Sequence, residues 1–172
     1  MTATTFDSTI VTGLLASALD HCAKKVGLPN RQAAVAAIQR GECATCECVR
    51  QGLAMAVAEY LGSVDSSIRA VYVYDPERAA TVDEPITPLG INLVVWASRK
   101  SAALSSMVDV IGKALAEEHR RLACPKGNAL CCALDVQLVD DDQVQSHSGY
   151  GALIHSLYVR PQEIWRRQAL TA

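Results

Sequence analysis

The chain has 172 residues, of which half are hydrophobic and 20% are charged, with a formal net charge of -2. This composition can fill a hydrophobic core and excludes a disordered chain. The small negative charge excludes bulk electrostatic attraction to nucleic acid. No apolar run approaches the roughly 20 residues that a membrane-spanning helix needs, and no signal peptide is visible. We therefore expect a cytoplasmic protein with neither a membrane nor a nucleic acid as its partner.

The first third of the chain predicts three helices. Apolar residues recur at helical spacing over residues 6–26, where the first helix is expected. Asn30 is suited to cap a second helix over residues 31–40. A third helix, capped by Thr45, is expected to end at Gly62.

The remainder of the chain alternates between strands and helices. Runs rich in β-branched and aromatic residues predict strands over 68–74, 91–97 and 130–139. A loop over 75–90 joins the first two strands, and a strongly amphipathic helix beginning at Ser101 joins the second and third.

The end of the chain and the fold class follow from the same patterns. Asp140 to Asp142 is expected to be a turn that ends the third strand, and two short helical segments are expected around Pro161. The fold class is therefore α/β (α+β), with N-terminal helices followed by a small three-stranded mixed sheet packed with helices. A helical, cysteine-bearing segment over 1–63 and an α/β core over 64–172 are expected to form one compact unit.

The three predicted strands carry a resemblance to a known family. Val71-Tyr-Val-Tyr74, Gly90-Ile-Asn-Leu-Val-Val-Trp96 and Leu134-Asp-Val-Gln-Leu-Val139 resemble, in order and hydrophobic pattern, the strands of the minimal nucleotidyltransferase fold, the palm-like core of the polymerase-β type. In that family the first strand ends in Gly-Ser, the second opens with Asp-x-Asp and the third carries another Asp. The resemblance covers about a hundred residues and implies a nucleotidyltransferase-like core.

The motifs of that family are degenerate in this chain. Asp75-Pro76 stands in place of Gly-Ser, Gly90-Ile91-Asn92 stands in place of Asp-x-Asp, and Asp135 alone matches a catalytic carboxylate. Two-metal phosphoryl transfer needs closely spaced anionic oxygens, which glycine and asparagine do not supply. The resemblance therefore implies a pseudoenzyme that does not use a magnesium-bound nucleotide. An active transferase with displaced carboxylates stays open as an alternative.

The resemblance also points to a ligand-binding face. Asn92 and Asp135 are the cleft candidates that it implies, and they occupy the catalytic positions of the family. Cys131 shares a strand face with Asp135, since residues four apart in a strand point the same way. We expect Asn92, Cys131 and Asp135 to line the cleft.

Cysteines form the other candidate site. Cys43, Cys46 and Cys48 crowd into six residues, and Cys124 lies far downstream. Thiols at this spacing can ligate zinc or iron, so these four are the candidate metal ligands. Cys46 and Cys48 lie about 200° apart around a helix, so they converge on one ion only if the helix begins after them. Plain structural thiols and redox chemistry remain alternatives.

Two functions from different classes follow. The first is a non-catalytic, nucleotidyltransferase-like module with a regulatory or accessory role, which binds a protein partner or a small nucleotide-like ligand. The second is a metal-binding protein centred on the cysteine cluster. Apolar helix faces also allow a homodimer.

Overall fold

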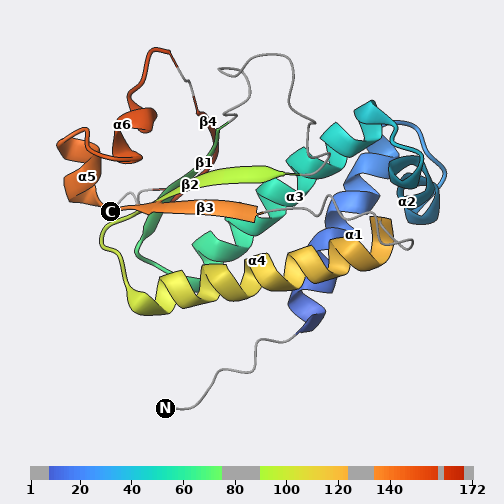
Figure 1. Cartoon of the computed structure of the whole chain (residues 1–172), viewed down its shortest axis with the longest axis horizontal. Helices are drawn as coiled ribbons and strands as arrows, with labels where there is room; N and C mark the ends of the chain where they lie inside the picture. Colours follow the sequence, from blue (N-terminus) through green and yellow to red (C-terminus); the bar gives the residue numbers. More distant parts are fainter. Residues whose placement is uncertain (1–7, 75–89, 124–133, 159–160, 169–172) are drawn as a thin grey trace. The chain divides into compact units, whose positions relative to one another are not determined.

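A computed structural model describes residues 8–74, 90–123, 134–158 and 161–168 of the chain (Figure 1). The chain divides into two compact units, each built from three segments. The first unit comprises Met1–Leu53, Thr87–Gly90 and Ser106–Leu134, and the second comprises Ala54–Ile86, Ile91–Ser105 and Asp135–Ala172. Two long helices, α3 (Cys43–Val64) and α4 (Ala102–Ala123), contribute to both units. None of the described helices is long and apolar enough to cross a bilayer.

The first unit is helical, as the sequence predicts. It holds α1 (Ser8–Lys25), α2 (Arg31–Gln39), the first half of α3 and most of α4. The side chain of Asn30 accepts a hydrogen bond of 2.9 Å from the backbone N–H of Ala33, which confirms it as the N-cap of α2. Buried aliphatic side chains of α1 and α3 fill the core of this unit: Val11, Leu15, Leu19, Val49 and Leu53.

Helix α3 begins earlier than the sequence predicts. The N–H of Cys46 donates to the carbonyl of Glu42 at 3.0 Å, so the helical ladder already runs from Glu42. Thr45, expected as the cap, is only 3% exposed and lies within the first turn. The helix also continues past Gly62 to Val64, so both predicted ends were placed inside the helix.

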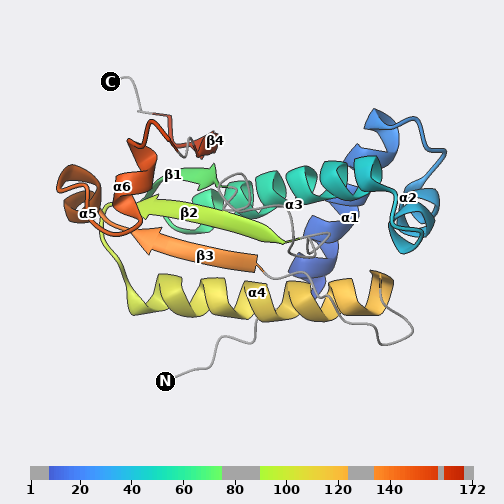
Figure 2. The same ribbon diagram turned by 45° about the horizontal axis from the view of Figure 1, so that its top comes forward.

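The second unit contains a four-stranded mixed sheet in the order β3-β2-β1-β4. Its strands are β1 (Ile68–Val73), β2 (Ile91–Ala97), β3 (Leu134–Val139) and β4 (Gln162–Arg166). Strand β1 pairs antiparallel with both β2 and β4. Strands β2 and β3 point the same way, and α4 lies between them in the chain (Figure 2).

The predicted three-stranded sheet was one strand short. Residues after Pro161 were expected to be helical, but they form β4, in which Trp165 pairs with Val71. The N–H of Arg167 extends this pairing by donating to the carbonyl of Arg69 at 2.8 Å. An unpaired edge of β1 offers hydrogen bonds that a short helix cannot use, and this tertiary pairing overrides the local pattern.

The turn predicted after β3 is instead a short helix. Asp140 caps α5 (Asp141–Gln145), because its side chain accepts from the N–H of Gln143 at 3.0 Å. Helix α6 (Gly151–Ile154) follows. Both helices pack on one face of the sheet, where a core cluster combines Ala70, Tyr72, Tyr74, Val94 and Val139 with Val144, Trp96, Leu153 and Ile154.

The opposite face of the sheet meets the second half of α3. Gly62 leaves room for the indole of Trp165, since a Cβ at this position would lie 2.2 Å from Cζ2 of that ring. Arg167 then donates to the carbonyls of Gly62, Asp65 and Ile68 at 2.7, 3.0 and 2.9 Å. These bonds satisfy one carbonyl in the last turn of α3, one directly after the helix and one at the start of β1.

Candidate functional site

The sheet face beneath α5 and α6 carries two of the predicted cleft residues. Asn92 lies opposite Tyr74, because the N–H of Tyr74 donates to the carbonyl of Asn92 at 3.1 Å. The hydroxyl of Tyr74 in turn donates to Oδ2 of Asp135 at 3.1 Å. Asn92 and Asp135 therefore share one face of the sheet, and their role in a ligand-binding cleft stays a prediction. Cys131, the third predicted residue, lies outside the described residues.

The carboxylate of Asp135 has protein donors on both oxygens. Nε2 of Gln137 donates to Oδ1 at 2.9 Å, while Tyr74 occupies Oδ2. Burial, followed by the nearby charge of Asp135, raises the pKa of Tyr74 above its ordinary value, so the phenol keeps the proton that it donates. The ring of Tyr150 lies 6.1 Å from that of Tyr74, tilted by 55°. Asp135 is thus held by donors from β1 and from its own strand.

The acidic residues after β3 are also engaged. Asp140 caps α5, and Asp141 accepts from Nε1 of Trp96 at 2.8 Å. Arg69 forms an ion pair with Asp141, and its guanidinium lies 5.9 Å from the centroid of the Trp96 ring. Asp141 therefore holds α5 against the sheet, while Asp140 stabilises the start of this helix.

The clustered cysteines point in different directions from α3. Cys43 is exposed at the first position of the helix. Cys46 is 6% exposed and packs against Ile38 of α2. Cys48 is equally buried but lies beside Cys22 of α1. Because the helix begins at Cys43, Cys46 and Cys48 stay about 200° apart on it.

Cys22 and Cys48 form a buried thiol pair. The thiol of Cys22 donates to the carbonyl of Thr45 at 3.6 Å. Burial, together with the neighbouring Cys48, raises the pKa of Cys22 to about 12. A thiol with this pKa stays protonated at neutral pH and acts as a small hydrophobic side chain.

A metal centre built on these cysteines stays a prediction. Within the part of the chain that the structure describes, no three His, Cys, Asp or Glu side chains gather as ion ligands do. Cys124, the distal ligand expected from the sequence, lies outside the described residues.

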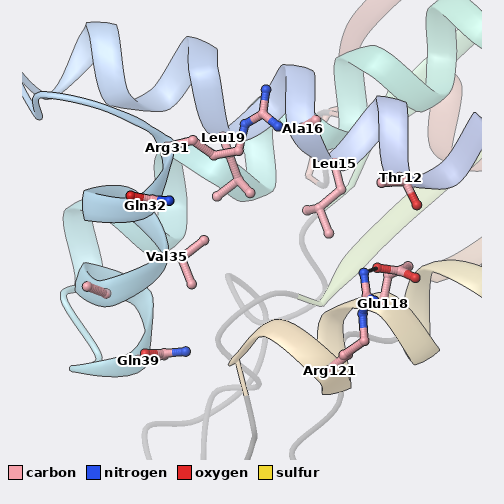
Figure 3. A pocket seen from close by; sticks show the side chains of 11 residues that line it. Thr12, Leu15, Ala16, Leu19, Arg31, Gln32, Val35, Gln39, Glu118 and Arg121 are labelled. Carbon is pink, nitrogen blue, oxygen red and sulfur yellow. Dashed lines mark hydrogen bonds and ion pairs between the residues drawn. The ribbon is translucent and has the colours of Figure 1, made fainter. Parts of the chain in front are cut away.

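An apolar pocket of about 350 Å³ opens in the first unit, between α1, α2 and the end of α4 (Figure 3). Leu15 and Leu19 of α1 are 5% and 2% exposed and form much of the floor. Val35 of α2 points toward this floor in Figure 3. Ala16 and Ala36 complete the apolar lining, and their small side chains leave the space open.

The rim of the pocket is polar. Thr12, Gln32 and Gln39 supply a hydroxyl and two amides. The charged residues of the rim are two arginines, Arg31 and Arg121, and one acid, Glu118. These lining residues together carry one net positive charge.

Both arginines of the rim have carboxylate partners. Arg121 pairs with Glu118 at 2.7 Å. Arg31 makes a two-pronged contact with Asp20, and this hydrogen bonding lowers the pKa of Asp20.

Sequence reasoning did not find this pocket. Ala16, Val35 and Ala36 look like ordinary positions on amphipathic helices. The signal, in retrospect, is that alanines recur where larger apolar side chains would fill the space. That signal is weak because alanine is also the best helix former.

Comparison with family models, with curated proteins and with solved structures finds no match for this chain.

Proposed function

We propose that the chain is a non-catalytic binding module that holds a small, mostly apolar molecule in the pocket of the first unit. The observation that carries this proposal is the pocket itself, which combines an apolar floor with a polar rim. Its volume of about 350 Å³ lies within the range of about 300–1,000 Å³ that is typical of small-molecule sites.

The energetics favour a ligand with an apolar body. Each buried CH₂ group of such a ligand contributes about 0.8 kcal/mol. Leu15, Leu19 and Val35 offer the surface against which it packs. The hydroxyl and amides of the rim can orient a polar end of the same molecule.

The charges of the rim favour a neutral or singly anionic head group. Three charged side chains line the pocket, and they sum to one positive charge. Each guanidinium already pairs with a carboxylate. A nucleoside triphosphate carries several negative charges and would need more free cations than this rim supplies.

In this proposal the second unit is a nucleotidyltransferase-like scaffold without transferase chemistry. The support is the network on its sheet face, where Tyr74 and Gln137 engage both oxygens of Asp135. A carboxylate that holds a metal ion needs its oxygens directed at the ion. The scaffold would then have a regulatory or accessory role.

The test uses the probe 1-anilinonaphthalene-8-sulfonate, which joins an apolar body to one anionic group. We expect about one probe per chain to bind with enhanced fluorescence. Ala16→Phe should weaken binding at least about tenfold, because its ring fills the pocket. Ser17→Phe adds the same ring at an exposed neighbouring position outside the pocket lining and should leave binding unchanged.

Two further measurements make this result decisive. Cooperative urea unfolding of each variant must show that the probe reports a folded pocket, because partly folded chains also bind it. Isothermal titration with decanoate, decanol and decylamine tests the head group, and decylamine should bind most weakly. Equal probe binding by the unmodified chain, Ala16→Phe and Ser17→Phe would overturn the proposal.

A further inference from the structure

Cys43 and Cys46 are placed so that a disulfide can join them. They lie three residues apart in the first turn of α3, on the same side of the helix. The geometry of an α-helix separates such Cα atoms by about 5 Å. That separation is within the range of about 4.4–6.8 Å that disulfides span, so the pair can close without unwinding the helix.

The two thiols differ in access. Cys43 is exposed, whereas Cys46 is 6% exposed against Ile38. A dissolved reagent can reach the sulfur of Cys43 but not that of Cys46. This difference suits thiol–disulfide exchange, in which an accessible thiol attacks the reagent and a second, nearby thiol then resolves the mixed disulfide.

We propose that Cys43 and Cys46 are an exchange-active dithiol that reacts with small-molecule disulfides. The thiolate of Cys43 attacks one sulfur of the disulfide, forms a mixed disulfide and releases one thiolate. Cys46 then gives up its proton to the solvent, attacks the sulfur of Cys43 and releases the second thiolate. The two cysteine thiols are oxidised to one disulfide, and the reagent is reduced to two thiols.

Cys22 and Cys48 provide an internal contrast. Both are buried, and the raised pKa of Cys22 keeps its thiol protonated. They should not react with the same reagent while the protein stays folded.

The experiment treats the reduced full-length chain with glutathione disulfide, blocks the remaining thiols by alkylation and maps each cysteine by mass spectrometry. We expect a Cys43–Cys46 disulfide in the unmodified sequence. Cys46→Ala should instead trap glutathione on Cys43. In Cys43→Ala, Cys46 should carry at least about tenfold less glutathione than Cys43 carries in Cys46→Ala, because the thiol of Cys46 is shielded.

Cys48→Ala serves as the matched control, since it removes a buried thiol of the same helix and should leave the Cys43–Cys46 disulfide unchanged. Circular dichroism must show equal helix content in all chains. Glutathione that stays on Cys43 of the unmodified sequence, with no disulfide to Cys46, would overturn the proposal. Equal labelling of Cys46 by glutathione in the unmodified sequence and in Cys43→Ala would also overturn the proposal. Neither result bears on the pocket, whose probe assay is separate.

Discussion

The two units of the chain differ in how accessible their candidate site residues are. In the first unit, an exposed thiol and the polar rim of a pocket face the solvent. In the second unit, Asp135 and Asp141 bond to donors from their own unit. A polar group whose bonding capacity is met inside the fold serves stability, whereas open volume and accessible sulfur mark where another molecule can bind.

The largest expected effect sets two glycines of α3 against each other. Gly62→Ala should lower the free energy of unfolding by about 3 kcal/mol, because the new Cβ would lie 2.2 Å from the Trp165 ring. Gly52→Ala meets Ala18 at an ordinary 3.4 Å and should raise it by about 1 kcal/mol through helix propensity. Urea unfolding measures both. Destabilisation of similar size at the two positions would show that the units do not differ in packing here.

The next effect concerns the backbone carbonyls between the last turn of α3 and the start of β1. Arg167→Ala removes bonds to three backbone carbonyls and should lower the free energy of unfolding by about 2 kcal/mol. Arg50 of the same helix makes an ion pair with Glu47, and Arg50→Ala should change stability by less than about 0.5 kcal/mol. Thermal unfolding distinguishes the two variants. A loss at Arg50 as large as that at Arg167 would contradict this reasoning.

A third prediction concerns alkaline pH, because both units contain buried groups with raised pKa values. Cys22 and Tyr74 have raised pKa values in the folded state, so the folded chain keeps protons that the unfolded chain releases. Stability should therefore fall as pH rises, by at most about 1.4 kcal/mol per pH unit and group. The fall begins near the unfolded pKa of 9.0 for the thiol and 10.0 for the phenol.

The variants separate these two contributions. Cys22→Ala should flatten the pH dependence first, between pH 9.0 and about 12, where the thiol titrates. Tyr74→Phe should flatten only the part above about pH 10. Denaturant unfolding at a series of pH values measures this. Curves for Cys22→Ala that run parallel to those of the unmodified chain would show that this thiol is not shielded.

The smallest expected effect compares two helix caps. Asn30→Ala and Asp140→Ala should each lower the free energy of unfolding by about 1 kcal/mol, since each removes an N-cap bond. Only Asn30 caps a helix that lines the pocket. Asn30→Ala should therefore also weaken probe binding, and Asp140→Ala should not. If both variants bound the probe equally well, probe binding would not depend on the N-cap of α2.

Much of the fold could be predicted because its signals are local. The helical spacing of apolar residues and the Asn30 cap located α2, and β-branched runs located β1 and β2. The ends of α3 were misplaced locally, by a few residues from the observed bounds, whereas the missing strand is an error that distant segments decide. Strand β4 forms because β1 has a free edge, and the sequence around Trp165 does not carry that information.

The candidate site divides in the same way. The spacing of Cys43 and Cys46 on one side of a helix follows from helix periodicity, whereas the pairing of Asn92 with Asp135 came from the family resemblance. The partner of Asp135 does not follow from local periodicity, because Tyr74 lies 61 residues away in the chain.

What the sequence determined by itself is therefore the set of short-range elements and the residue spacing within them, because hydrogen bonds over a few residues and side-chain periodicity fix both. The tertiary structure alone decided the fourth strand, the hydrogen bond between Tyr74 and Asp135, and the pocket. Each of these depends on which distant surfaces meet. In the pocket, residues from α1, α2 and α4 lie around one space that small side chains leave unfilled.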